Sequence, residues 1–158
     1  MKDGAGITIR PIRPEDEPLM AEFHTTLSDL TVYLRYFASL SLHARVAHER
    51  LLRICFGDYD REMVLVAEED DPRTGSPRIL GVGRLNKLSG SKNEAEVAVL
   101  VCDACKNRGL GLELLRRVIE VAKAEQVTRV SSEMLGNDVA MQSICNKLGF
   151  QFLSLIHI

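Results

Sequence analysis

The feature that most restricts the fold is an apolar segment that runs through a glycine-containing turn into a long amphipathic helix. Residues 94–101 end in the run Val-Ala-Val-Leu-Val, which predicts a strand covered on both faces. Residues 106–111, Lys-Asn-Arg-Gly-Leu-Gly, form the turn, and from Gly109 onward apolar residues recur at helical spacing. Residues 129–134 then predict another strand. Because a strand, a helix and a second strand in succession favour parallel pairing, we expect a parallel strand pair here.

The earlier strands follow one another through short polar turns. Apolar and polar residues alternate over residues 7–11, and apolar runs occupy 63–67 and 79–88. The polar segments at 70–77 and 89–93 are typical of turns, so consecutive strands are expected to form hairpins. The sequence therefore predicts an α/β (α+β) domain on a mixed, mostly antiparallel sheet.

Three further helices are predicted. The first begins at Asp16, a natural N-cap followed by apolar residues at helical spacing. The second covers about residues 42–56, and a short one covers 139–147. The aromatic residues at 31–37 fit neither a helix nor a strand pattern clearly.

Length and charge limit the classes of partner. The chain has 158 residues, enough for one hydrophobic core, so we expect a single domain over 1–158. The formal net charge is −2, which gives no large basic surface for nucleic acid or anionic lipid. No apolar run approaches the ~18 residues that span a bilayer, and the first residues lack the apolar region of a signal peptide. We therefore expect a cytoplasmic protein with no nucleic-acid or membrane partner.

The cysteines raise the question of a metal or redox site. Cys102 and Cys105 have the spacing of half a zinc site, but no second cysteine pair or clustered histidine pair supplies the other ligands. A redox dithiol would stand at the start of a helix, whereas Arg108 still precedes the predicted helix here. We therefore expect no metal and incidental reduced cysteines, which include Cys55 and Cys145.

The glycine-containing turn has a chemistry of its own. Glycines let backbone N–H groups approach a ligand, and a helix N-terminus carries partial positive charge, so this turn suits a diphosphate. On these residues alone, a turn that binds no ligand has equal weight. A P-loop is excluded because no Gly-Lys-Ser/Thr is present, and Gly109 and Gly111 do not complete the GxGxxG of dinucleotide-binding folds.

Several motifs give the chain a resemblance to a known family. Residues 106–111 resemble the Gln/Arg-x-x-Gly-x-Gly/Ala acyl-CoA signature of GNAT acyltransferases, with Lys106 in the first position. Residues 9–16 resemble the opening strand and helix cap of that family, and residues 146–150, Asn-Lys-Leu-Gly-Phe, resemble its closing segment. A narrower resemblance, to the GNAT domain of bacterial Pat-type protein-lysine acetyltransferases, lies in residues 33–37, 48–56 and 58–63. The resemblance implies a GNAT fold with about six strands and about four helices.

The resemblance also implies acetyl-CoA as co-substrate and a place for it. The backbone of Val99, Leu100 and Val101 would pair with the pantetheine arm, as an added peptide strand does. The family's pantetheine-contacting Asn falls on Asp138, so Asn137, one place earlier, is the candidate for that contact. The residues implied to hold the pyrophosphate are Lys106, Arg108, Gly109, Leu110, Gly111 and Leu112.

The Pat-type resemblance places the general base at Glu96. A lysine amine has a reference pKa of ~10.4, so it must lose a proton before it attacks, and a carboxylate in a cleft can accept that proton. The amine then attacks the thioester directly, and a backbone N–H near Val99 would stabilise the oxyanion. Glu94 and Glu133 are competing candidates for the base, and a structural carboxylate is the alternative for Glu96. Cys145 stands where many GNAT enzymes carry a tyrosine acid, and we expect it to be a packed thiol.

The acceptor is expected to be the ε-amine of a protein lysine, because of the Pat-like segments. Two alternatives stay open. One is acetylation of a small amine, and the other is a catalytically silent module that senses acyl-CoA. The residues that would attract a small cationic amine are Asp58, Asp60 and Glu62.

Two further segments bear on the acceptor site. The side chains at 33–37 either line the acceptor cleft or pack on the sheet as a lid; they include Tyr33, Arg35, Tyr36 and Phe37. Residues 151–158 do not resemble the family's closing strands, and we expect them to be a non-native tail that leaves the acceptor half shortened.

Overall fold

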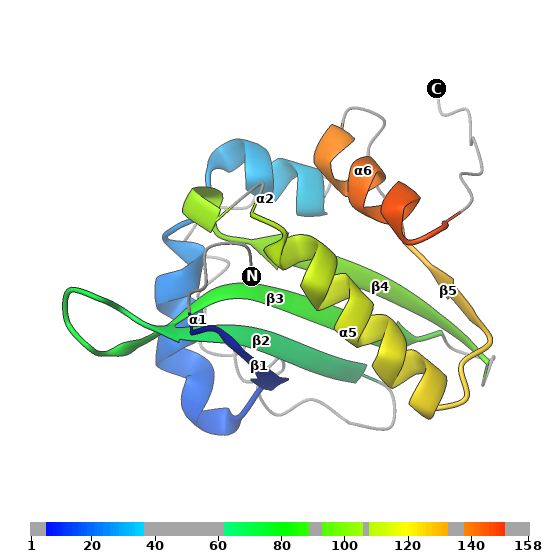
Figure 1. The fold of residues 1–158 in the computed structure, drawn as a ribbon, viewed down its shortest axis with the longest axis horizontal. Helices are drawn as coiled ribbons and strands as arrows, with labels where there is room; N and C mark the ends of the chain where they lie inside the picture. The colour runs from blue at the N-terminus through cyan, green and yellow to red at the C-terminus, as the bar shows by residue number, and fades with distance from the viewer. Residues whose placement is uncertain (1–5, 37–61, 89–92, 106–107, 133–137, 151–158) are drawn as a thin grey trace.

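Five strands follow one another across a single sheet, in the order β1-β2-β3-β4-β5 (Figure 1). The computed structural model describes residues 6–36, 62–88, 93–105, 108–132 and 138–150. The strands are β1 (Thr8–Pro11), β2 (Glu62–Asp70), β3 (Pro77–Lys87), β4 (Glu94–Val101) and β5 (Arg129–Ser131). The helices are α1 (Glu17–His24), α2 (Asp29–Tyr36), α5 (Leu110–Ala124) and α6 (Val139–Lys147). Two 3₁₀ helices are η1 (Pro14–Asp16) and η2 (Asp103–Cys105).

The sheet topology confirms the predicted mixed sheet. The first four strands are antiparallel neighbours, and β4 and β5 form the one parallel pair of the described residues. Within those residues the sheet has five strands, not the predicted six or so. The helix predicted over residues 42–56 lies outside the described residues.

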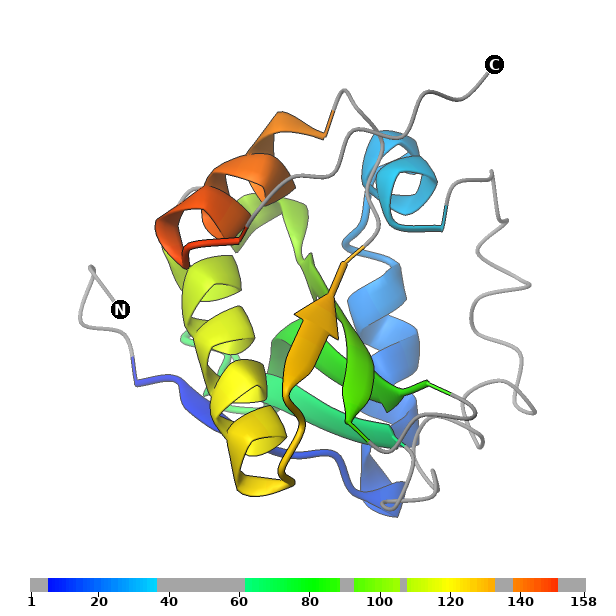
Figure 2. The ribbon, with the colours of Figure 1, turned by 90° about the vertical axis from the view of Figure 1, so that its right-hand side faces the viewer.

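Helices cover both faces of the sheet. Figure 2 shows α1 and α5 on opposite sides of it. On the α1 side, Met20 and Phe23 belong to the same buried cluster as Leu100 of β4. On the α5 side, Leu115 belongs to a second cluster with Val97 of β4. Because side chains alternate along a strand, Glu94, Glu96 and Ala98 share the α1 face with Leu100.

Asp16 is the N-cap residue of α1, as predicted, but its side chain does not cap the helix. That side chain is buried. Its carboxylate accepts two hydrogen bonds from the Arg10 guanidinium, both 2.8 Å, and one from the backbone N–H of Arg13 at 2.7 Å. Burial, the largest single effect, would raise the pKa of Asp16, but the hydrogen bonds from Arg10 and from the Arg13 backbone, together with the positive charges of both arginines, lower that pKa below its usual value. Asp16 therefore joins β1 to the start of the helical layer.

The helix α2 depends on a residue that is far away in sequence. Asp103 Oδ1 accepts hydrogen bonds from Thr31 Oγ1 at 3.0 Å and from the Ser28 backbone N–H at 3.2 Å. Ser28 precedes the helix, and its hydroxyl also accepts a hydrogen bond from the Thr31 backbone N–H at 3.2 Å. A carboxylate at a helix N-terminus is stabilising because it meets unpaired N–H groups and the positive end of the dipole. The start of α2 is thus fixed to the segment that follows β4.

None of the helices in the described segments has the length and apolar character needed to cross a bilayer.

Candidate functional site

The sheet opens between β4 and β5. The parallel register joins Glu94 to Arg129 and Glu96 to Ser131, where β5 ends. β4 continues for another five residues, to Val101. Beyond Glu96, no strand of the described residues pairs with β4 on that side. Figure 1 shows α6 near this open end of the sheet.

The open edge presents backbone hydrogen-bonding groups. The Cys102 N–H donates to Leu80 O at 2.8 Å, and Glu94 O accepts from the Leu88 N–H at 3.0 Å, so the even-numbered residues of β4 face β3. Because alternate residues of a strand direct their backbone groups to opposite sides, Val99 and Val101 direct theirs to the open edge. An unpaired edge of this kind can accept an extended chain as an added strand.

Leu100 differs from its two neighbours. Its backbone groups face β3 and its side chain is buried in the core on the α1 face. Of the three β4 residues that the sequence placed at the site, two therefore offer their backbone to the open edge.

The N-terminus of α5 lies next to this edge. Gly109 occupies the N-cap position with φ 86°, a left-handed conformation that favours glycine, and no side chain caps the helix. The first backbone bond of the helix runs from the Glu113 N–H to Gly109 O, at 3.1 Å. The N–H groups of Leu110, Gly111 and Leu112 consequently have no acceptor within the helix, and they lie at the positive end of its dipole.

The helix end and the open strand are in close contact through Gly111. A Cβ on this glycine would lie 3.7 Å from Val101 Cγ2 and 3.8 Å from Val99 Cγ1. It would also lie 3.0 Å from Ile144 Cδ1 of α6. The structure thus brings together the glycine turn and the β4 segment that the sequence assigned to one site.

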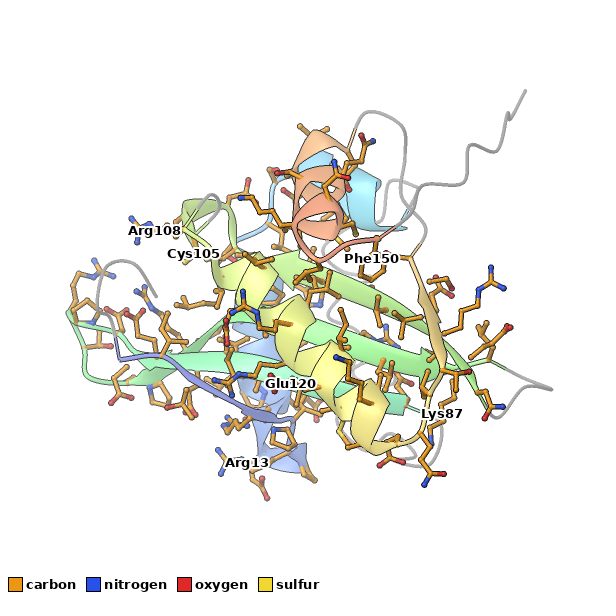
Figure 3. The ribbon with its side chains drawn as sticks, turned by 45° about the vertical axis from the view of Figure 1, so that its right-hand side comes forward. Arg13, Lys87, Cys105, Arg108, Glu120 and Phe150 are labelled. Carbon is orange, nitrogen blue, oxygen red and sulfur yellow. The ribbon has the colours of Figure 1, made fainter. Side chains whose placement is uncertain are left out.

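The other predicted residues of the turn lie as follows. Arg108 is exposed and precedes the helix at the surface (Figure 3). The Leu110 side chain is buried in the core, so only its backbone faces the site. Lys106 and Asn137 lie outside the described residues.

Glu96 is half-buried on the α1 face of β4, three residues before Val99. It forms no ion pair with any residue that the structure describes. Glu94, the competing candidate, has a 44% exposed side chain that lies 4.0 Å from the Arg129 guanidinium. Glu133 lies outside the described residues. A partly desolvated, unpaired carboxylate is better suited to accept a proton than one held by a cation.

The three cysteines that the structure describes, Cys102, Cys105 and Cys145, are buried free thiols, and Cys55 lies outside the described residues. Burial raises the pKa of Cys102 to about 12, and a hydrogen bond with Cys105 adds to the effect. Cys145 is fully buried in the cluster on the α5 side, and burial raises its pKa too. Within the part of the chain that the structure describes, no three His, Cys, Asp or Glu side chains gather as a metal site.

Sequence reasoning missed two side chains next to Glu96. Asn86 lies directly opposite Glu96 on β3, and Arg84 lies one step along the same face. Neither residue belongs to a motif, and only the strand register brings them to Glu96. Of the proposed acceptor residues, Phe37, Asp58 and Asp60 lie outside the described residues, as do the side chains of Tyr33, Arg35 and Tyr36.

The chain is similar to known acetyltransferases in sequence and in fold. A family model described as acetyltransferase (GNAT) domain matches residues 7–151. A Pseudomonas aeruginosa protein named Acetyltransferase PA5475 is 29% identical over 152 residues, which cover 95% of this chain and 77% of that protein. The crystal structure of the GNAT domain of S. lividans PAT has a TM-score of 0.82 and 26% identity, and the match covers 94% of this chain and 84% of that one. A cAMP-binding acyltransferase from Mycobacterium smegmatis has a TM-score of 0.62 and 26% identity over 94% of this chain and 40% of that one.

Proposed function

The chain belongs to the GNAT acetyltransferase domain family, and on that basis we propose that it acetylates the ε-amine of a protein lysine with Glu96 as the general base. Acetyl transfer in general follows from the family and from the similar acetyltransferases. The acceptor, the base and the residues that bind the co-substrate are our proposals.

GNAT acetyltransferases use acetyl-CoA as co-substrate, and the site offers complementary groups for its diphosphate and for its pantetheine arm. The diphosphate would accept hydrogen bonds from the N–H groups of Gly111 and Leu112 at the start of α5. The pantetheine amides would pair with the backbone of Val99 and Val101, along the open edge of β4. Arg108 and Lys106 would add positive charge at the diphosphate, and Asn137 would contact the pantetheine.

The transfer step needs a proton acceptor and a donor for the oxyanion. Glu96 takes a proton from the lysine ammonium, directly or through water, and the neutral amine attacks the thioester carbonyl. The Val99 N–H, which faces the open edge, stabilises the oxyanion that forms. The new C–N bond replaces the C–S bond, and the thiolate of CoA takes up the proton that the attacking nitrogen loses, which its reference pKa of ~8.5 allows. The observation that carries this assignment is that Glu96, where the edge of β4 opens, is half-buried and has no ion-pair partner among the described residues.

Two likenesses to the same group of proteins favour a protein lysine as the acceptor. The Pat-like segments of the sequence lie between residues 33 and 63. The structural similarity to the GNAT domain of S. lividans PAT covers 94% of this chain.

The test is an acetylation assay with the full chain, acetyl-CoA and a panel of acyl-CoA synthetases as protein acceptors. We expect thiol release and acetyl-lysine in the acceptor, and we expect Glu96→Gln to abolish both while CoA binding, measured by calorimetry, is retained. Release of thiol with polyamines or amino acids alone would favour the small-amine alternative. Binding of CoA without any thiol release would favour the silent sensor. Loss of activity in Glu94→Gln but not in Glu96→Gln would move the base to Glu94.

A further inference from the structure

Glu96 has a neighbouring carboxylate in the same row of the sheet. Glu62 of β2 lies opposite Asn86 of β3, and Asn86 lies opposite Glu96 of β4. Since directly opposed residues share a face, the two carboxylates flank a neutral amide. The row crosses the sheet face on which α1 packs.

A single cation lies within reach of both carboxylates. Arg84 is two residues before Asn86 on β3, so its side chain is on the same face. It lies opposite Val64 on one side and Ala98 on the other. It is therefore the diagonal neighbour of Glu62 and equally of Glu96. Diagonal neighbours in a sheet are ~7–8 Å apart, a distance that long side chains can bridge.

The structure shows which carboxylate Arg84 pairs with. Its Nη2 donates a hydrogen bond to Glu62 Oε1 and forms an ion pair with it. The exposed fractions of the two side chains are 29% and 22%, so water only partly screens the pair. Among the described residues, Glu96 has no such partner.

We propose that Glu62 is a positioning residue that holds the Arg84 guanidinium away from Glu96 and thereby keeps Glu96 available as a proton acceptor. The inference rests on the proposed role of Glu96 as the base. A guanidinium paired with a carboxylate stabilises its charged form and makes it a weaker base. A guanidinium at Glu96 would also repel the ammonium of the acceptor. Asn86 keeps the space between the two carboxylates neutral.

The other charged groups near Glu96, among the described residues, lie as follows. Glu94, on the same face of β4, lies 4.0 Å from Arg129 of β5. α5 packs on the opposite face. The titratable residues of α1, which packs on the same face as Glu96, are Glu17, Glu22 and His24. Arg84 is thus the cation that the strand register places next to Glu96, and Glu62 competes with Glu96 for it.

The test is the pH profile of kcat/KM for acetyl transfer by the full chain. In Glu62→Gln, Arg84 loses its charged partner and turns to Glu96, so the acidic limb of the profile shifts by about one pH unit toward lower pH, and the plateau falls several-fold. In the double variant Glu62→Gln/Arg84→Gln no guanidinium can turn to Glu96. The acidic limb and the plateau of its pH profile should therefore return to the wild-type values.

A matched control lies at the other end of the same two strands. Arg78 of β3 pairs with Glu69 of β2 at 2.9 Å, also with partly exposed side chains. Glu69→Gln removes an equivalent cross-strand pair far from Glu96, and its pH profile should coincide with that of the wild type. A shift in Glu69→Gln equal to that in Glu62→Gln would show a general effect of lost charge and would overturn the proposal.

The outcome is separable from that of the proposed function. The role of Glu62 is overturned if Glu62→Gln has the wild-type pH profile, or if the double variant stays impaired. In either case, an inactive Glu96→Gln variant would still support Glu96 as the base. If Glu96→Gln retains transfer, the base assignment fails instead. A carbon-13 NMR titration of the Glu96 carboxyl then tests, independently of activity, whether Arg84 turns to Glu96. The Glu96 titration must move to lower pH in Glu62→Gln and return in the double variant; no movement contradicts the proposal.

Discussion

Gly111 of α5 lies so close to Ile144 of α6 that a Cβ on the glycine would sit 3.0 Å from Ile144 Cδ1. The same atom would be 3.7 Å from Val101 Cγ2, at the open end of β4. Three elements that border the proposed CoA site therefore meet at a position without a side chain. A larger residue there must either displace α6 or enter the space beside β4.

This contact predicts a graded response to substitution at Gly111. Gly111→Ala should be tolerated, because Ile144 Cδ1 is the end of a flexible side chain and can move by a few tenths of an ångström. Gly111→Val should lower CoA affinity about tenfold, since overpacking at this point pushes α5 away from β4. Calorimetry with CoA measures the affinity, and thermal unfolding shows whether each variant is folded. A folded Gly111→Val variant with wild-type affinity would contradict the proposed site.

The left-handed turn at Gly109 predicts a second effect on CoA binding. Gly109→Ala must hold φ near 86° against a penalty of roughly 1–2 kcal/mol, and relief of that strain would move the N–H groups of the helix start. We expect about tenfold weaker CoA binding. Gly75 is the matched control, because it also has a positive φ, 72°, and a Cβ added there would meet nothing within 4 Å. Gly75→Ala should lose similar thermal stability but bind CoA normally; equal losses of affinity would argue against a site at Gly109.

Local sequence patterns were sufficient to predict the strand and the helix that form the proposed site. The apolar run at 94–101 and the helical repeat after Gly109 predicted β4 and α5 almost to the residue, because periodicity and a glycine turn are local signals. They were not sufficient to predict α2, because its aromatic sequence fits neither a helix nor a strand pattern clearly. Its start is completed by Asp103, a residue 72 positions after Thr31.

The surroundings of Glu96 could not be predicted for a related reason. The pairing of Arg84 with Glu62 depends on the register of β2 with β3, and the nearness of both residues to Glu96 depends on the register of β3 with β4. A shift of one residue would place these side chains on the other face. Asp16 illustrates the same limit, because its sequence position indicates a cap while its burial beside Arg10 makes it an ion-pair partner.

The buried pair of Asp16 and Arg10 predicts a stability that depends on pH. The pKa of Asp16 is lowered in the folded chain, so its stabilising contribution is present above the unfolded pKa of ~3.9 and is lost as pH falls through the folded pKa. Asp16→Ala should cost about 3 kcal/mol at pH 7, because Arg10 loses a buried partner. Urea unfolding of both proteins from pH 7 into the acidic range measures the difference. It should shrink as the pH falls, and a difference that is constant or grows would contradict this role.

The buried thiol of Cys102 predicts low reactivity. Because its pKa is raised to about 12, almost no thiolate exists at pH 7.5. Iodoacetamide should leave Cys102 unmodified in the folded chain and alkylate it after unfolding in urea, which peptide mass spectrometry can show. Rapid alkylation of Cys102 in the native protein would instead point to a reactive thiol.

Calorimetric titration of the full chain with CoA and with pantetheine tests the central claim most directly, because only CoA carries the diphosphate. If the N–H groups at the start of α5 hold that diphosphate, CoA should bind one site per chain, and pantetheine should bind at least about tenfold more weakly. No detectable binding of CoA, or equal affinity for the two compounds, would contradict the account.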